Sequence, residues 1–204
     1  MVSYDARTAL VVVDVQNDFA DPGGSLHVTG ADEVVARVNL EIGRALRGGA
    51  MVVYTQDWHP PSTPHFEKDG GIWPVHCVAD SWGAAFHPRL RVAGDVVRKG
   101  SNGEDGYSGF TMRDPVSGEE IPTPLEAMLR GRGIGRVVVV GLATDYCVNA
   151  TVLDARRLGF ETAVVVGACA AVNLEPDAGA AALAAMEAAG AELARESEPV
   201  ETQP

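Results

Sequence analysis

Short apolar runs rich in β-branched residues recur along the chain, without the polar alternation of strands that face solvent on one side. Such runs are typical of parallel strands that are buried on both faces of a sheet. The pattern predicts strands over residues 9–13, 51–55, 96–97, 137–140 and 163–166, and a last strand over 191–194.

Segments with helical periodicity lie between these runs. In residues 32–47 the apolar side chains form one stripe, acidic residues occupy the first turn, and Gly48 and Gly49 follow the last turn, which favours a helix. Similar patterns predict helices over residues 124–130, 145–158 and 177–189. Strands that alternate with helices predict an α/β fold, a Rossmann-like three-layer sandwich in which a mostly parallel sheet of about six strands is flanked by helices on both faces.

Two long segments interrupt the alternation. Residues 59–91 are rich in proline and glycine, and residues 100–123 are rich in glycine and polar side chains. Loops of this length in a compact domain are usually functional. Because no internal repeat or linker divides the chain, we expect one domain over residues 1–195 and a flexible tail over residues 196–204.

Composition narrows the class of protein. The chain has 204 residues, enough to bury a core without disulfides, and a formal net charge of −12, which opposes binding to nucleic acid. Three widely spaced cysteines indicate free thiols in a reducing compartment. No segment has the pattern of a signal peptide or the ~18 apolar residues of a membrane span, so we expect a cytoplasmic protein without a nucleic-acid or membrane partner. The composition leaves a homo-oligomer open.

Chemically versatile residues stand where the predicted strands end. Asp14, Asp57 and Lys99 follow or close the first three strands, and Cys147 follows the fourth after a short turn. In an open α/β sheet, ligands bind beyond the carboxyl ends of the strands. We therefore expect these four side chains to share one edge of the sheet.

Three of these residues suit amide hydrolysis. Cys147 begins a predicted helix, where the macrodipole favours a thiolate and the amides of the turn can form an oxyanion hole. Asp14 can take the thiol proton and return it to a leaving group, and Lys99 can stabilise both charges. The plainer alternatives are a buried inert cysteine, an aspartate that caps a turn, and a solvated surface lysine.

A histidine cluster follows the second strand. Asp57 and His59 are two residues apart, so in an extended chain both side chains point to the same side, and His65 and His76 follow in the same segment. Imidazole and carboxylate ligands suit one divalent metal ion such as zinc, iron or manganese, and they do not suit calcium. Histidines scattered over the surface are the alternative.

Six motifs taken together resemble the nicotinamidase/pyrazinamidase branch of the isochorismatase-like cysteine hydrolases. The resemblance covers nearly the whole chain in order, and it is carried by DVQNDF (14–19), DWHP (57–60), WPVHCV (73–78), RKG (98–100), YSGF (107–110) and GLATDYCV (141–148). It implies an isochorismatase-like hydrolase domain and a metal-dependent amidase. Such an enzyme converts nicotinamide to nicotinate and ammonia in NAD salvage, and pyrazinamide to pyrazinoate.

The resemblance also implies roles for residues of the reaction. Cys147 would attack the carboxamide carbon and form a thioester, Asp14 would accept and later donate the proton, and Lys99 would hold the ion pair. The N–H groups of Ala143 and Cys147 would form the oxyanion hole, with a cis peptide bond between Leu142 and Ala143.

The remaining implied residues hold the metal and the substrate ring. Asp57, His59, His65 and His76 match the metal positions, and that metal is expected to bind the pyridine nitrogen of the substrate. Phe19 and Trp73 match positions that pack on the ring, with Tyr107 nearby. Tyr146 stands where some relatives carry histidine, a change expected to alter the pocket wall and not the chemistry.

Two other functions stay open on the sequence. A related cysteine hydrolase acting on a different small amide or carbamoyl compound would not need the histidine cluster. A non-catalytic module that senses metal or oxidant through Cys147 and the histidines would leave Asp14 and Lys99 unexplained.

Overall fold

The strands of the computed structural model form one six-stranded sheet and one small hairpin. The structure describes residues 2–195, and the tail expected over residues 196–204 lies outside the described residues. The strands of the sheet are β1 (Thr8–Val13), β2 (Met51–Asp57), β3 (Asp95–Lys99), β6 (Arg136–Leu142), β7 (Glu161–Ala170) and β8 (Glu192–Ala194). The hairpin consists of β4 (Thr111–Arg113) and β5 (Glu120–Pro122).

The strand order in the sheet is β3-β2-β1-β6-β7-β8, and neighbouring strands are parallel throughout. β1 is central, with β2 on one side and β6 on the other. Parallel strands need crossover connections, and α-helices supply them except between β2 and β3, which a long loop over residues 58–94 connects. The predicted α/β architecture is therefore confirmed, including its six strands.

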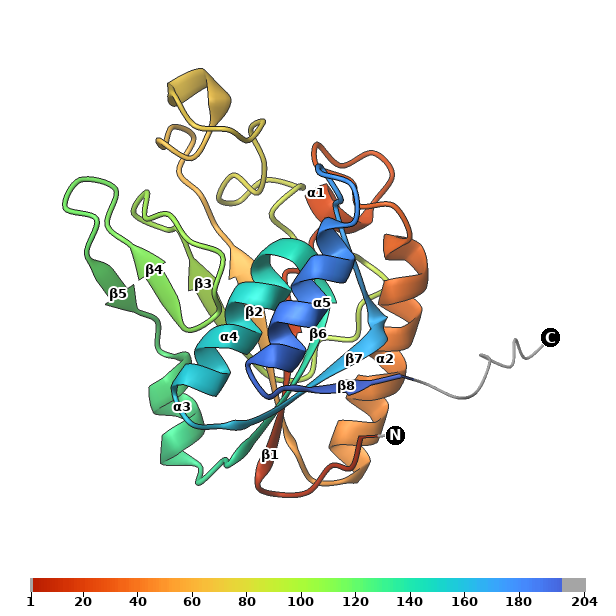
Figure 1. Cartoon of the computed structure of the whole chain (residues 1–204). Coiled ribbons are helices and arrows are strands. Elements are labelled where there is room, and N and C mark those ends of the chain that lie inside the picture. The colour runs from red at the N-terminus through yellow and green to blue at the C-terminus, as the bar shows by residue number, and fades with distance from the viewer. Residues whose placement is uncertain (1, 196–204) are drawn as a thin grey trace.

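The helices cover both faces of the sheet, as Figure 1 shows with α2 at one side and α4 and α5 in front. They are α1 (Asn17–Ala20), α2 (Ala31–Arg47), α3 (Leu125–Gly131), α4 (Asn149–Arg157) and α5 (Ala178–Ala188), with a 3-10 turn η1 (Glu67–Asp69) and a π-helical turn η2 (Thr144–Val148). Successive side chains of a strand point to opposite faces, so β1 contributes to two cores. Leu10 and Val12 belong to the core under α2, whereas Ala9, Val11 and Val13 belong to the core under α3, α4 and α5.

The differences from the predicted elements are local. The helix expected over residues 145–158 begins as η2 and continues as α4. The elements α1, η1, β4 and β5 were not predicted, because segments of three or four residues are too short to show a period.

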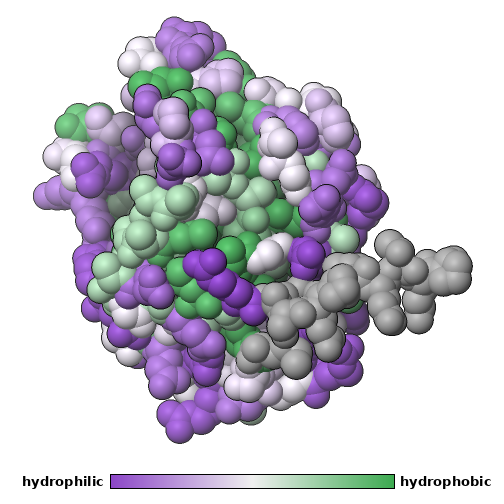
Figure 2. Space-filling view, turned by 45° about the vertical axis from the view of Figure 1, so that its right-hand side comes forward, coloured by the Kyte–Doolittle hydropathy of each residue, from purple (hydrophilic) through white to green (hydrophobic). Residues whose placement is uncertain are grey.

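The outer side of α5 is rich in alanine. Ala180, Ala181, Ala184, Ala185 and Ala188 are exposed there, and they contribute to the apolar side chains that gather on the face shown in Figure 2. None of the helices within residues 2–195 combines the length and the apolar character that crossing a membrane would require.

Candidate active site

The carboxyl ends of four strands bring the expected side chains together. Asp14 follows β1, Asp57 and Lys99 close β2 and β3, and Cys147 lies one short turn after β6. One ligand atom of each of Asp14, Asp57 and Cys147 lies within 4.8 Å of those of the other two. The parallel arrangement of the sheet is the cause, since it places these strand ends at the same edge.

Lys99 is the buried cation of this group. Its side chain is 1% exposed, and its Nζ lies 2.9 Å from Oδ2 of Asp14, forms an ion pair with Oδ1 of Asp57, and donates to Sγ of Cys147 at 3.6 Å. Burial alone would lower the pKa of Lys99, but the carboxylates of Asp14 and Asp57 hold this pKa above its usual value. The lysine is therefore charged, and the alternative of a solvated surface lysine is wrong.

Asp14 is held by neighbouring strands and not by its own turn. It has a positive φ of 47°, and its Oδ1 accepts a hydrogen bond from Oγ1 of Thr55 at 2.6 Å. Burial raises the pKa of Asp14, with the charge of Lys99 acting in the opposite direction. The carboxylate therefore binds a proton more readily than an exposed aspartate does, as a general base near neutral pH requires.

Cys147 is a thiol and not a resting thiolate. The sequence suggested that the helix terminus would favour the thiolate, but burial raises the pKa of Cys147 even with Lys99 lowering it. The expected macrodipole effect is thus outweighed, because the side chain is nearly enclosed. Such a thiol needs a base before it can act as a nucleophile.

The turn before Cys147 contains Ala143, which the resemblance assigned with Cys147 to the oxyanion hole. The peptide bond between Leu142 and Ala143 is cis, as the resemblance implied. The carbonyl of Ala143 accepts the N–H groups of Tyr146 at 3.1 Å and Val148 at 3.0 Å. The N–H of Cys147, which lies between these two donors in the sequence, is not among the hydrogen bonds to this carbonyl, because the turn is π-helical.

Three histidines form a second cluster beside the thiol. One ring nitrogen from each of His59, His65 and His76 lies within 4.8 Å of the others. Nε2 of His59 lies 3.9 Å from Oδ2 of Asp57. Both ring nitrogens of His59 are buried without a hydrogen-bond partner among the described residues. Buried polar atoms without partners are unfavourable, so this arrangement suits a bound cation.

Protonation and tautomers in this cluster also suit a metal. Burial lowers the pKa of His59 to about 4 and also lowers the pKa of His76, so both imidazoles are neutral. For Asp57, burial opposes ionisation, yet the charge of Lys99 brings its pKa down to about 2. Nδ1 of His76 donates to the carbonyl of Pro74 at 2.8 Å, which leaves Nε2 as the free ligand atom. Neutral imidazoles and an ionised carboxylate are ligands for a borderline divalent ion.

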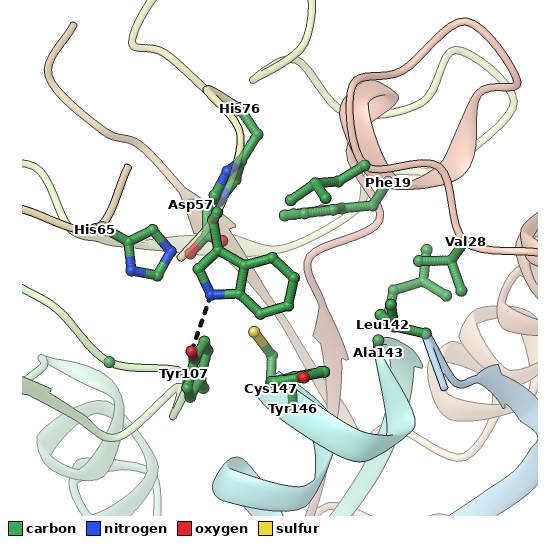
Figure 3. A pocket seen from close by; sticks show the side chains of 14 residues that line it. Phe19, Val28, Asp57, His65, His76, Tyr107, Leu142, Ala143, Tyr146 and Cys147 are labelled. Atoms are coloured by element: carbon green, nitrogen blue, oxygen red, sulfur yellow. Dashed lines mark hydrogen bonds between the residues drawn. The ribbon is translucent and has the colours of Figure 1, made fainter. Parts of the chain in front are cut away.

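An aromatic pocket opens above Cys147 (Figure 3). Nε1 of Trp73 donates to the hydroxyl of Tyr107 at 3.0 Å, and the ring of Trp73 meets that of Tyr146 edge to face with centroids 4.9 Å apart. Phe19 lies across from them, with its ring centroid 5.5 Å from that of His76. The resemblance matched Phe19 and Trp73 to ring-packing positions and placed Tyr107 nearby, and all three line this pocket.

Three supporting residues were missed at the sequence level. Gln16 holds the end of β2, because its side chain accepts the N–H of Asp57 at 2.9 Å and donates to the carbonyl of Asp57 at 2.7 Å. Thr55 bonds Asp14, and the period of two along the strand could have indicated it, because it lies two residues before Asp57. Asp105 lies 2.7 Å from Nδ1 of His65, and nothing in its glycine-rich surroundings marks it.

Comparisons with known proteins concern the chain as a whole. Residues 8–198 match the isochorismatase domain family. A nicotinamidase of Escherichia coli strain K12 is 38% identical over 96% of this chain and 98% of its own length. Among solved structures, PnC1 from L. infantum in complex with nicotinate has a TM-score of 0.84 and 36% identity, covering 95% of this chain and 96% of that chain. A pyrazinamidase of Pyrococcus horikoshii in complex with zinc has a TM-score of 0.82 and 37% identity, covering 93% of this chain and 99% of that chain.

Proposed function

The chain belongs to the isochorismatase family, and within that family we propose that it is a metal-dependent cysteine amidase that hydrolyses nicotinamide to nicotinate and ammonia. The observation that carries this function is the position of Cys147, Asp14 and Lys99 beside a histidine cluster and under an aromatic pocket. A nucleophile, a base and a cation serve amide cleavage, and the histidines and aromatic rings suit a pyridine ring.

The first half of the reaction forms a thioester. Asp14 takes the proton of the Cys147 thiol, and the sulfur attacks the carboxamide carbon. The charge on the carbonyl oxygen is stabilised by the N–H groups of Ala143 and Cys147. Asp14 then donates its proton to the leaving nitrogen, the C–N bond breaks, and ammonia departs.

The second half restores the enzyme. Asp14 takes a proton from water, and the resulting hydroxide attacks the thioester carbon. The C–S bond breaks, and Asp14 returns its proton to the sulfur of Cys147. The product leaves as nicotinate after the second proton of the water is lost from the new carboxyl group to solvent. The negative charge moves between Asp14 and Cys147 during the reaction, and the ammonium group of Lys99 compensates it in both positions. Lys99 stays charged throughout, which is consistent with the raised pKa of this lysine.

The substrate ring is oriented by the other half of the site. Asp57, His59, His65 and His76 would hold one divalent ion, which when bound supplies a Lewis acid for the pyridine nitrogen. The rings of Phe19, Trp73 and Tyr107 would pack on the substrate ring. Zinc in the similar pyrazinamidase supports zinc as one occupant, while iron and manganese suit the same ligands.

This activity places the enzyme in NAD salvage, with pyrazinamide as a second substrate because it differs from nicotinamide by one ring nitrogen. The three free cysteines among the described residues suit a reducing compartment, and we place the enzyme in the cytoplasm. The competing function is hydrolysis of a carbamoyl compound without a pyridine ring. That reaction does not require the buried histidine cluster.

The proposed function is tested by measuring kcat/KM for nicotinamide, pyrazinamide and an N-carbamoyl amino acid with purified, metal-loaded protein. Nicotinate or pyrazinoate formation is followed by chromatography, and the Cys147→Ala variant serves as the inactive control. We expect kcat/KM for nicotinamide to exceed that for the carbamoyl compound by orders of magnitude. Faster hydrolysis of the carbamoyl compound would contradict the proposed function.

A further inference from the structure

Asp105 lies beside the histidine cluster but outside the motifs that carry the family resemblance. Its Oδ1 is 2.7 Å from Nδ1 of His65. The His65 side chain is 7% exposed, whereas that of Asp105 is 54% exposed, so the carboxylate approaches the imidazole from the solvent side. With Nδ1 engaged in this way, Nε2 is the nitrogen of His65 that remains for an ion.

The backbone around Asp105 is fixed by the β4–β5 hairpin. The N–H of Asp105 donates to the carbonyl of Arg113 at 2.9 Å, and the N–H of Arg113 donates back to the carbonyl of Asp105 at 2.5 Å. Oδ1 of Asp105 also accepts the N–H of Gly106 at 2.8 Å. The backbone of Asp105 is therefore anchored to β4, and its carboxylate is oriented by the N–H of Gly106 as well as by His65.

Gly106 allows the chain to turn at this point. Its φ is +134°, and a Cβ built there would lie 3.2 Å from Cα of Met112 in β4. The turn places Asp105 against His65 and the next side chain, Tyr107, under the indole N–H of Trp73. Residues 105–107 thus contact both the histidine cluster and the aromatic wall of the pocket.

We propose that Asp105 is a positioning residue that orients His65 toward the divalent ion. A carboxylate that accepts the Nδ1–H of a histidine fixes the tautomer and the ring orientation, and it makes Nε2 a stronger ligand. This inference rests on the proposed metal site. It also gives the hairpin a function, because β4 holds Asp105 in place.

The test measures zinc affinity of the metal-free protein by competition with a chelator. Removing the carboxylate partner of a metal-bound histidine typically costs about 10- to 100-fold in metal affinity. We expect a loss of that size in Asp105→Ala and a smaller loss in Asp105→Asn, which keeps an acceptor oxygen but not the charge. Asp105→Glu should recover part of the affinity.

Asp114→Asn is the matched control. Asp114 lies in the same hairpin, and its Oδ1 accepts the N–H groups of Val116 at 2.9 Å and Ser117 at 2.7 Å. The control removes one negative charge from the hairpin and weakens hydrogen bonds within its loop, but it does not change the contact with His65. We expect its zinc affinity to match that of the wild type.

A second readout needs no metal. Nitrogen-15 chemical shifts of the histidines in the metal-free protein report which ring nitrogen carries the proton. We expect His65 to be protonated at Nδ1 in the wild type and to become a mixture of tautomers in Asp105→Ala. A role limited to holding the loop would leave the tautomer unchanged.

The outcomes separate this inference from the proposed function. Wild-type zinc binding with equal affinity in Asp105→Ala would overturn the role of Asp105 and leave the metal site standing. Equal weakening in Asp105→Ala and Asp114→Asn would also overturn it. A wild-type protein that does not bind zinc, iron or manganese would overturn both. Should Asp105→Ala fail to fold, the comparison of Asp105→Asn with Asp114→Asn decides.

Discussion

Nζ of Lys99 lies 2.9 Å from Oδ2 of Asp14, and both side chains are buried at strand ends that β2 separates. The same ammonium group pairs with Asp57 and approaches the sulfur of Cys147. One cation therefore joins the proposed catalytic carboxylate, the nucleophile and a proposed metal ligand. The two halves of the site are electrostatically linked through it.

Replacing Lys99 by glutamine is expected to damage stability as well as activity. The change leaves Asp14 and Asp57 as buried carboxylates without their cation, and breaking a buried ion pair from one side typically costs about 3–5 kcal/mol. Urea denaturation should therefore show a lower free energy of unfolding, together with loss of ammonia release. An unchanged unfolding free energy would show that the carboxylates do not depend on this cation.

Cys147→Ala should abolish amide hydrolysis, whereas Cys169→Ala should retain it. Cys147 faces Lys99 and the pocket, while the Sγ of Cys169 bonds the carbonyl of Val165 at 3.5 Å. Burial raises the pKa of both thiols, to about 12 for Cys169, and the difference is that Cys147 has the carboxylate of Asp14 beside it as a base. Ammonia release by the two variants is the measurement, and equal loss in both would count against Cys147 as the nucleophile.

Thr55→Val should reduce catalysis without changing the volume of the side chain much. The hydroxyl of Thr55 donates to Oδ1 of Asp14 at 2.6 Å, and a buried acceptor left without its donor costs about 1–3 kcal/mol of stability. The carboxylate also loses the contact that fixes its orientation beside Cys147, so we expect kcat/KM to fall. Thr55→Ser, which keeps the hydroxyl, is the matched control. Wild-type kcat/KM in Thr55→Val would show that Asp14 needs no such support.

His76→Ala and Asp57→Ala should lower metal content and substrate affinity together while leaving the fold intact. His76 presents Nε2 to the cluster because its Nδ1 is engaged by Pro74. His76→Ala is the cleaner of the two variants, since Asp57 also pairs with Lys99. Metal content is measured by elemental analysis, and KM by initial rates. Unchanged metal stoichiometry in both variants would refute the metal site.

The sheet and its strand ends could be predicted because each strand is marked by a pattern within its own few residues. The β-branched runs mark buried parallel strands, and parallel strands end at one edge, so the meeting of Asp14, Lys99 and Cys147 follows from the sequence pattern. The histidines were visible for a different reason. Asp57 and His59 are two residues apart in an extended segment, and His65 and His76 follow in the same loop.

The supporting contacts depend on long-range packing that no local pattern carries. His65 and Asp105 lie 40 residues apart, and Asp105 is positioned by a hairpin too short to predict. The protonation state of Cys147 also could not be predicted from local sequence. The helix terminus is readable from the sequence, but the burial that raises the pKa of the thiol comes from elements distant in the chain.

A metal-dependent nicotinamidase must lose its activity when its metal ion is removed. Ammonia release from nicotinamide is measured with protein as isolated, after chelation, and after adding back zinc, iron or manganese. We predict that release disappears on chelation and returns with at least one of the three ions. Absence of release under every condition, with the protein shown to be folded, would mean that the chain is not a nicotinamidase.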